Sequence, residues 1–313
     1  MATIDLTDLP DAPSAGLHLL DPLPRRLALT LPELQWLAKA AGGAPLPFDV
    51  TQPGPSSSLD SRLGPSRASA DDAAYLAARA SLHDPAETLL RRGLVDETGA
   101  ADPTLLGAIG LLATPRVALE IDVAVGSTQV KAWHRSTPDA VATLSTVDGL
   151  VFEIAWFAPE KWSGELARVA ALPEDFRAGD SVVPPVMTCP FELVDAVGEA
   201  LAQSRTDLVQ VLVAQHPGTV RVDGVPLGSV AATRALRCLH TEAVGRLRVL
   251  AATVEDDPAH GREVGVLSWV LLADGWHALE ADPDTTDPDV RVRRVDPAEL
   301  AADLAPVLAG VGA

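Results

Sequence analysis

Three residues near the end of the chain carry the side chains of a hydrolytic triad: Ser268, Asp274 and His277. A serine nucleophile, a histidine base and a carboxylate that orients the histidine would together support acyl transfer. Asp274 also begins an Asp-Gly pair, however, and such a pair is typical of a tight turn between two strands. The same pair recurs at 148–149. The duplication favours a turn, and we expect no catalytic residue here.

Two other arrangements have the residue types of a metal site. His240 and Glu242 are a candidate ligand pair, but side chains two residues apart on a helix point in different directions. Four aspartates cluster further on, and carboxylate oxygens of this kind bind calcium; they are Asp282, Asp284, Asp287 and Asp289. A calcium-binding loop counted from the first would need a glycine in place of Asp287 and an acid in place of Arg293. The sequence therefore predicts no metal and no cofactor.

The common signatures of catalysis and nucleotide binding do not occur in the sequence. It has no G-x-S-x-G, G-x-x-x-x-G-K-[ST], G-x-G-x-x-G or H-E-x-x-H motif. Cys189 and Cys238 are far apart and form no C-x-x-C pair, so we expect free, buried side chains. Six tryptophans lie mostly in expected strands or apolar helix faces, where burial is their usual role. We expect a protein that is not an enzyme.

Composition and charge exclude several classes of function. With 313 residues, 47% of them hydrophobic and 21% charged, the chain can bury a sizeable core. Its 43 acidic and 24 basic residues give a net charge of −19, which repels nucleic acids and anionic membrane surfaces. The longest charge-free apolar stretch, 103–115, is shorter than the roughly 20 residues of a membrane span. Residues 1–20 contain no Lys or Arg, so we expect no secretory signal and a cytoplasmic location.

Two stretches rich in Pro, Gly or Ser punctuate the chain. Residues 49–72 have no apolar period and too little hydrophobic surface to offset the entropy of ordering, so we expect a mobile surface loop. Residues 173–190 contain Gly179 and four prolines, two of them adjacent at 184–185, which interrupt a helix and remove backbone hydrogen-bond donors. We interpret this second stretch as a hinge between an N-terminal half, 1–172, and a C-terminal half, 191–313.

The two halves have a similar order of expected elements. The first begins with a strand at 26–30 and a helix at 31–41, followed by helices at 86–94 and 103–112, strands starting at 117, 129, 140 and 151, and a helix from 159 to about 172. The second has helices at 191–202, 207–215 and 230–239, strands starting at 247, 263, 276 and 290, and a helix from 297 that Pro306 should kink or end. Short connections favour antiparallel pairing. We therefore predict an α+β fold of antiparallel meanders flanked by helical bundles, in two pseudo-twofold-related halves.

This order of elements resembles that of the EspG family of chaperones associated with ESX, or type VII, secretion. The resemblance rests on LALTLPELQWLAKAAG from Leu27, on LLRRGLVDETGAADPTLLGAIGLLATPRVALEIDV from Leu89, and on GVLSWVLLADGW and VRVRRVDPAELAADLAPVL near the end. It extends from about Leu27 to the last residue. It implies a pseudo-symmetric α+β fold with a central antiparallel sheet, two helical bundles and no catalytic site.

The resemblance also implies a partner and the residues that bind it. Family members bind the helical tip of a PE-PPE heterodimer, keep it soluble and deliver it to the secretion machinery. Their contacts come from the loop between the first two strands of the N-terminal meander and from the C-terminal bundle. The corresponding residues are Val125, Gly126, Ser127, Thr128 and Gln129 in the loop, and Asp195, Glu199, Gln203, Arg205 and Gln210 in the bundle. The loop is a tight turn here, so the expected partner is a PE-PPE-like heterodimer or a WXG-type protein.

Some alternatives stay open at the level of sequence. The helix at 191–202 carries a stripe of apolar residues, Phe191, Val194, Val197, Gly198 and Leu201, which fits either a core or a binding patch. An uncharacterised small-molecule enzyme would need a polar pocket with ionisable side chains. A self-associating scaffold would bury its apolar patch between copies, whereas the chaperone is expected as a monomer or weak dimer without nucleic-acid or membrane partners.

Overall fold

The computed structural model describes residues 25–48, 67–174, 176–253, 264–281 and 289–311, without the side chains of 67–72. The chain divides into two units. Unit 1 comprises residues 1–116 and 133–159, and unit 2 comprises 117–132 and 160–313. The predicted pseudo-twofold relation between 1–172 and 191–313 stays a prediction, because these units are defined by contacts and not by symmetry.

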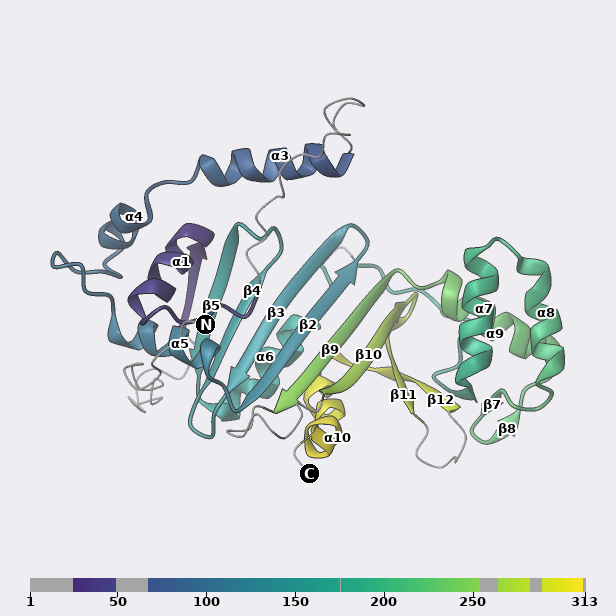
Figure 1. Cartoon of the computed structure of the whole chain (residues 1–313). Helices are drawn as coiled ribbons and strands as arrows, with labels where there is room; N and C mark the ends of the chain where they lie inside the picture. The colour runs from purple at the N-terminus through teal and green to yellow at the C-terminus, as the bar shows by residue number, and fades with distance from the viewer. Residues whose placement is uncertain (1–24, 49–66, 175, 254–263, 282–288, 312–313) are drawn as a thin grey trace, which may run out of the picture. The chain divides into compact units, whose positions relative to one another are not determined.

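The fold is α+β, with an antiparallel sheet as predicted (Figure 1). In the described residues twelve strands follow one another in the order β1-β5-β4-β3-β2-β9-β10-β11-β12-β6-β7-β8. The strands of the two meanders are β1 (Arg25–Thr30), β2 (Val117–Val125), β3 (Thr128–Ser136), β4 (Val141–Thr146), β5 (Val151–Phe157), β9 (Gly245–Thr253), β10 (Val264–Leu272), β11 (Gly275–Ala281) and β12 (Asp289–Val295). The outer strands of the second meander are β6 (Val186–Pro190), β7 (Arg221–Val222) and β8 (Val225–Pro226). Each predicted meander strand is present.

The helices agree with most of the expected ones. Unit 1 contains α1 (Leu31–Ala40), α3 (Arg67–Ala80), α4 (Pro85–Arg91) and α5 (Pro103–Ala113). Unit 2 contains α6 (Trp162–Val169) after the 3-10 turn η2 (Pro159–Lys161), a bundle of α7 (Phe191–Ala202), α8 (Thr206–Gln215) and α9 (Ser229–Thr241), and α10 (Leu300–Val311) after η3 (Pro297–Glu299). Pro306 lies inside α10, which continues five residues beyond it.

The prediction of one loop over 49–72 is wrong at its end. Residues 67–72 form the first turns of α3, because the run of alanines that continues to residue 80 has high helix propensity without an apolar period. Tyr75 on this helix donates a hydrogen bond to the carbonyl of Gly149 at 3.2 Å, in the turn between β4 and β5. Residues 49–66 lie outside the described part of the chain, as do residues 282–288 of the aspartate cluster.

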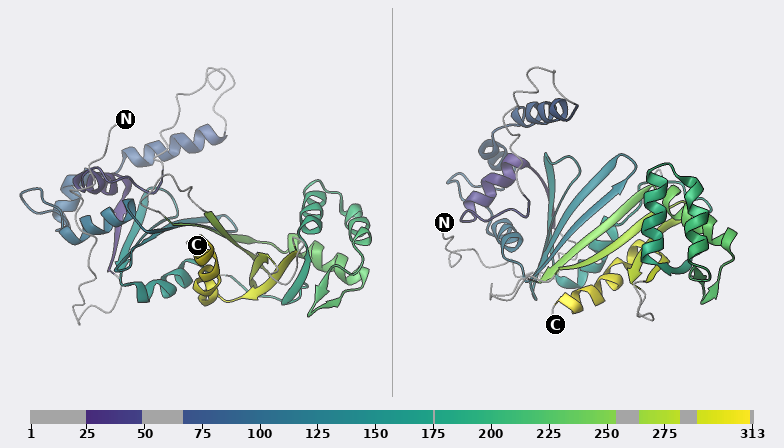
Figure 2. Two further views of the ribbon diagram at one scale, coloured as in Figure 1. Left: turned by 60° about the horizontal axis from the view of Figure 1, so that its bottom comes forward. Right: turned by 45° about the vertical axis from the view of Figure 1, so that its right-hand side comes forward.

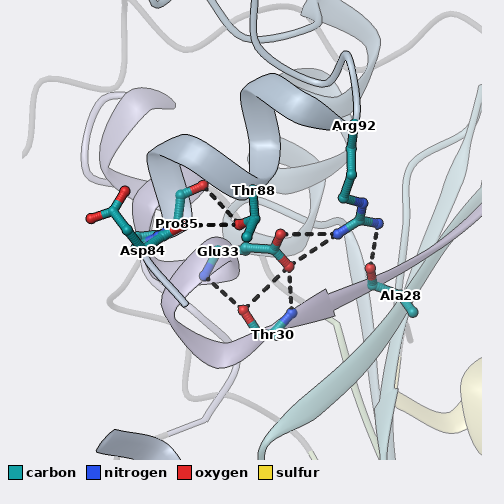
Figure 3. A network of polar contacts seen from close by, with 7 residues as sticks. All are labelled: Ala28, Thr30, Glu33, Asp84, Pro85, Thr88 and Arg92. Carbon is teal, nitrogen blue, oxygen red and sulfur yellow. Dashed lines mark hydrogen bonds and ion pairs between the residues drawn. The ribbon is translucent and has the colours of Figure 1, made fainter. Parts of the chain in front are cut away.

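A buried glutamate joins three segments of unit 1 (Figure 3). Glu33 accepts hydrogen bonds from the backbone N–H and the hydroxyl of Thr30 at 2.8 and 3.2 Å, while Thr30 caps α1. Arg92 donates to both carboxylate oxygens of Glu33 at 3.0 Å and to the Ala28 carbonyl of β1 at 2.6 Å. Burial raises the pKa of Glu33, but hydrogen bonds from Thr30, Thr88 and Arg92 outweigh it and hold the pKa below its usual value. The network fixes β1, α1 and the end of α4.

In unit 2, α10 packs on one face of β9 and β10 and against α6, whose Leu166 belongs to the same core, as does Ala170 directly after it (Figure 2). Side chains that alternate along the strands form this core, among them Leu119, Ile121 and Val123 of β2. The indole N–H of Trp276 donates to the Ala170 carbonyl at 2.8 Å, and that of Trp269 to the Asp303 carboxylate at 3.2 Å. Both buried indoles therefore have hydrogen-bond partners.

The bundle of α7, α8 and α9 packs on strands at the far end of unit 2. Its core includes Val270 and Leu272 of β10, Val292 of β12 and Met187 of β6, and these side chains point away from the α10 layer. This end of the sheet is therefore covered on both faces. The first strands of the unit, β2 and β9, contribute residues only to the α6–α10 core.

Candidate functional site

The arrangement of the described helices leaves one surface of unit 2 without a covering helix, and we name it the open face although Ala118 and Ala252 within it are buried. It comprises the side chains of β2, β9 and the start of β10 that point away from α6 and α10, and in Figure 1 no described helix of unit 2 lies over it. Strand register sets its rows: Glu120 is opposite Leu250, Asp122 is opposite Arg248, and Ala124 is opposite Arg246. The open face has an apolar part and a charged part.

The apolar part lies toward the far end of β9. Val264 and Val266 of β10 are 54% and 50% exposed, which is unusual for β-branched side chains on a sheet surface. A pocket of about 160 Å³ lies here and is lined by Ala118, Glu120, Leu250, Ala252 and Val264. Small-molecule sites have volumes of roughly 300 to 1,000 Å³. This pocket therefore suits one apolar side chain of a partner better than it suits a substrate.

The charged part lies where β9 begins. Arg246 and Arg248 are both exposed and, two residues apart, point to the same face. Asp122 is directly opposite Arg248 in the neighbouring strand. Within the described residues, none of these three side chains has a hydrogen bond or ion pair. Arg293, on the opposite face, instead contacts Glu280, Glu299 and Asp303 at 2.6 to 2.8 Å.

The predicted loop 125–129 is a tight turn at the charged end of the open face. Gly126 has a φ of +58°, which favours glycine, and its backbone N–H donates to the Val244 carbonyl at 3.0 Å. Val244 lies between α9 and β9. A Cβ on Gly245 would be 2.6 Å from the Ala124 carbonyl oxygen, so this position needs glycine for the strands to approach. The turn is thus fastened to the base of the bundle, while Gly126, Ser127, Thr128 and Gln129 are exposed and Val125 is half-buried.

The predicted bundle residues are all exposed. Gln203 donates to the Glu199 carboxylate one turn earlier in α7, and Arg205 makes a two-point ion pair with Asp207 at 3.0 and 2.9 Å. Glu199 lies near the end of α7, Gln203 and Arg205 lie in the α7–α8 connection, and Asp207 and Gln210 lie on α8. Asp195 lies on α7 near His240 and raises the pKa of that histidine in part, although burial lowers it overall. Their role in binding stays a proposal.

The apolar stripe of α7 is mainly core. Val197 is fully buried, Val194 and Leu201 pack against the bundle core, and Phe191 is 56% exposed at the start of the helix. Gly198 faces the ring of His240, whose Nε2 lies 3.0 Å from the Val194 carbonyl. The stripe therefore holds α7 against α9 and presents only Phe191 to a partner.

The structure separates the residues of the suspected triad. Ser268 lies on the open face, whereas His277 is fully buried beside the bundle. His277 Nε2 is 3.8 Å from Asp274 Oδ1, and neither atom has a hydrogen-bond partner within the described residues. The predicted hairpin turn is present, but it consists of Ala273 and Asp274, and Gly275 already begins β11, where it pairs with Leu272 and has a φ of +127°. Within the described residues His277 has no hydrogen bond to Ser268, which lies two residues along β10 from Val270, the residue opposite His277.

The other candidate ligands have structural contacts. Glu242 accepts hydrogen bonds from the Ser181 hydroxyl at 2.6 Å and the Val182 backbone at 3.2 Å, and it lies just after α9. Cys189 is buried and Cys238 half-buried, both as free thiols, and burial raises the pKa of Cys189 to about 12. Within the described residues no group of three His, Cys, Asp or Glu could hold a metal ion. No described helix is long and apolar enough to cross a bilayer.

The fold is similar to that of type VII secretion chaperones. The structure of Mycobacterium tuberculosis EspG5 in complex with the PE25-PPE41 dimer superimposes with a TM-score of 0.59 and 12% sequence identity. The match covers 91% of this chain and 96% of that one, so the likeness concerns the whole fold and not one motif. No protein-family model matches the sequence, and no curated protein matches it significantly.

The open face is the part of the site that sequence patterns did not identify. Its side chains come from β2, β9 and β10, and only the register between β2 and β9 brings Asp122 beside Arg248. The sequence does contain one indication of this face. Glu120 and Asp122 alternate with apolar residues on one strand, and Arg246 and Arg248 alternate with apolar residues on another. This alternation indicates that each strand has one exposed side.

Proposed function

We propose that this protein is a cytoplasmic chaperone of type VII secretion, which binds a helical substrate of the PE-PPE or WXG type and delivers it to the secretion machinery. The observation that carries the proposal is the likeness to EspG5 over 91% of the chain. EspG5 was determined in complex with the PE25-PPE41 dimer. By this proposal, our protein binds its substrate as a monomer or weak dimer, without a cofactor and without catalysis.

The surface that we assign to the substrate combines the predicted residues of α7 and α8 with three other parts of unit 2. The turn 125–129 and the base of α9 are joined by the Gly126–Val244 hydrogen bond. The open face begins directly below them, since Ala124 and Arg246 are opposite each other in register. An apolar patch with a polar rim is typical of a protein-binding surface and suits a helix with one apolar side.

Co-expression tests the proposal. Each PE-PPE pair and WXG-type protein encoded in the same genome is produced with the tagged chain, and the mass of any complex is measured by size-exclusion chromatography with light scattering. We expect a soluble one-to-one complex with one of these substrates. If all of them stay separate from the chaperone, or if the chain elutes only as a large homo-oligomer, the proposal is wrong.

Charge reversal tests the bundle residues. The triple variant Gln203→Glu, Arg205→Glu and Gln210→Glu should weaken the complex and lower the melting temperature only slightly, because the contacts that it removes, Arg205–Asp207 and Gln203–Glu199, are exposed and such contacts stabilise by about 1 kcal/mol or less. Arg91→Glu, at an exposed position of α4 in unit 1, is the control for added negative charge. Unchanged affinity of the triple variant would exclude this part of the bundle from the surface.

A further inference from the structure

The open face carries positive charge in a strongly acidic chain, on two arginines that form no ion pair with the part of the chain that the structure describes. Arg246 and Arg248 are exposed on one strand, and no described residue forms an ion pair with either. Arg246 is flanked in register by Ala124 and Val270, and Arg248 by Asp122 and Ser268. The chain has a net charge of −19. Two guanidinium groups on the same side of one strand are therefore a local positive site on a negatively charged chain.

The spacing of the two arginines matches a feature of helices. Residues i and i+2 of a strand are about 7 Å apart on one face. Side chains at i and i+3 or i+4 of a helix have Cβ atoms about 5 to 6 Å apart. A guanidinium group offers several N–H donors in a planar fork, which bind carboxylates by two parallel hydrogen bonds. The pair can therefore bind two acidic side chains on adjacent turns of one helix.

The apolar part of the open face fixes the direction of such a helix. Arg246, Arg248, Leu250 and Ala252 follow one another on the same side of β9, because alternate residues of a strand share a face. The pocket of about 160 Å³ beside Leu250, Ala252 and Val264 has room for an apolar side chain. A helix with acids at one end and an apolar residue one or two turns away would meet both parts at once.

We propose that the open face selects its substrate by charge: Arg246 and Arg248 bind two acidic residues at the helical tip of the PE-PPE or WXG-type partner, while an apolar residue of that tip enters the pocket beside Leu250 and Val264. This inference rests on the proposed function. The carboxylate of Asp122 lies opposite Arg248 and forms no ion pair within the described residues. It adds discrimination because it repels a substrate whose acidic side chains would lie over β2 instead of β9.

The test compares affinities for the substrate that co-purifies in the experiment above. Arg246→Glu with Arg248→Glu should weaken binding about 10- to 100-fold, because reversal replaces two attractions by repulsions. Arg246→Lys with Arg248→Lys keeps the charge but loses the planar fork, and should weaken binding less. Arg234→Glu with Arg237→Glu is the matched control, since both residues are exposed on α9 of the same unit and carry the same charge. Melting curves of all variants should coincide.

A charge swap in the substrate completes the test. Lysines in place of the two acids at the substrate tip should restore binding to the double Glu variant and abolish binding to the unchanged chaperone. The affinity of the unchanged chaperone for the unchanged substrate should also decrease as the salt concentration rises from about 0.05 to about 0.5 M. Equal affinity of the Arg246→Glu, Arg248→Glu variant, or failure of the swap to rescue it, would overturn the inference while leaving the proposed function intact. Failure of every substrate to bind the unchanged chain would overturn both.

Discussion

At the scale of single residues, the contact between Gly198 and His240 sets the spacing of α7 and α9. A Cβ on Gly198 would be 2.8 Å from the His240 ring, and the ring is held by the Val194 carbonyl. Glycine inside a helix usually costs about 0.5 to 1 kcal/mol relative to alanine. Its presence here indicates that close packing of the ring outweighs that cost.

Gly198→Ala should therefore destabilise the bundle by about 1 kcal/mol, because the clash exceeds the gain in helix propensity. The matched control is Gly310→Ala in α10, where an added Cβ would have no neighbour within 4 Å among the described residues. The control should be neutral or slightly stabilising. Chemical denaturation measures both changes, and a stabilised Gly198→Ala would contradict the assignment of this contact.

His277 should make stability depend on pH. Burial lowers its pKa, despite the facing carboxylate of Asp274 and a contribution from Glu242, and Arg294 lowers it further. Because the unfolded chain has a pKa of about 6.5 at this residue, it takes up the proton first as pH falls. The free energy of unfolding therefore has its full contribution from neutral His277 above about pH 6.5. This contribution is lost as the pH falls through the lower pKa of the folded state, and the free energy of unfolding decreases by at most about 1.4 kcal/mol per pH unit.

The variant His277→Gln should consequently lose less stability than the unchanged chain between pH 7 and pH 5. The free energy of unfolding, followed by denaturant titration at each pH, gives the two slopes. His83→Gln, at an exposed position, serves as the control and should keep the original slope. Identical slopes for His277→Gln and the unchanged chain would contradict a neutral buried His277.

At the scale of elements, the Glu33–Arg92 ion pair holds β1, α1 and α4 together. Glu33 is 2% exposed, so Arg92→Met would leave a buried carboxylate without its main partner. We expect a loss of about 2 kcal/mol, which corresponds to about 30-fold faster hydrogen exchange of α1 amides. Arg91→Met replaces a neighbouring arginine that is exposed, and should leave exchange unchanged. Equal exchange in the two variants would show that the pair adds nothing to unit 1.

Elements with a clear period were predicted well, and those without one were not. Asp102 and Pro103 predict the start of α5, and the structure has Asp102 as its N-cap with hydrogen bonds to two backbone N–H groups. The alanine-rich start of α3 gave no amphipathic signal. The strand β6 was assigned to a hinge, because Pro190 and the prolines before Val186 obscure five residues that pair with β12. The two-residue strands β7 and β8 are too short for any period.

At the scale of the whole molecule, the sequence predicts the parts of the candidate site that depend on local pattern and not the part that depends on pairing between distant strands. The turn 125–129 and the bundle residues follow from resemblance and local pattern. The open face depends on β2 lying beside β9, a pairing between strands far apart in the chain that period alone does not specify. Because β2 pairs with β9, the two meanders that the sequence predicts separately belong to one sheet of the described residues.

The exposed valines of the open face give a prediction for the free protein. Val264→Lys with Val266→Lys should raise the solubility limit and reduce any weak self-association, since it removes the largest exposed apolar side chains of that face. Light scattering over a range of concentrations measures the effect. The melting temperature should stay within a few degrees, because both side chains are about half exposed. Unchanged scattering would mean that this face does not cause self-association in the absence of a substrate.

The pairing of β2 with β9 also has a consequence for synthesis on the ribosome. Unit 1 is complete once residue 159 has emerged, but β2 has no neighbour on its far side until residues 245–253 are made. At about 5 to 20 residues per second, that delay is on the order of ten seconds. During that time the backbone of β2 has an unpaired edge next to the apolar side chains of Leu119, Ile121 and Val123, and it can pair with other nascent chains. Translation that stops before residue 253 should therefore release an aggregating fragment with a folded first unit.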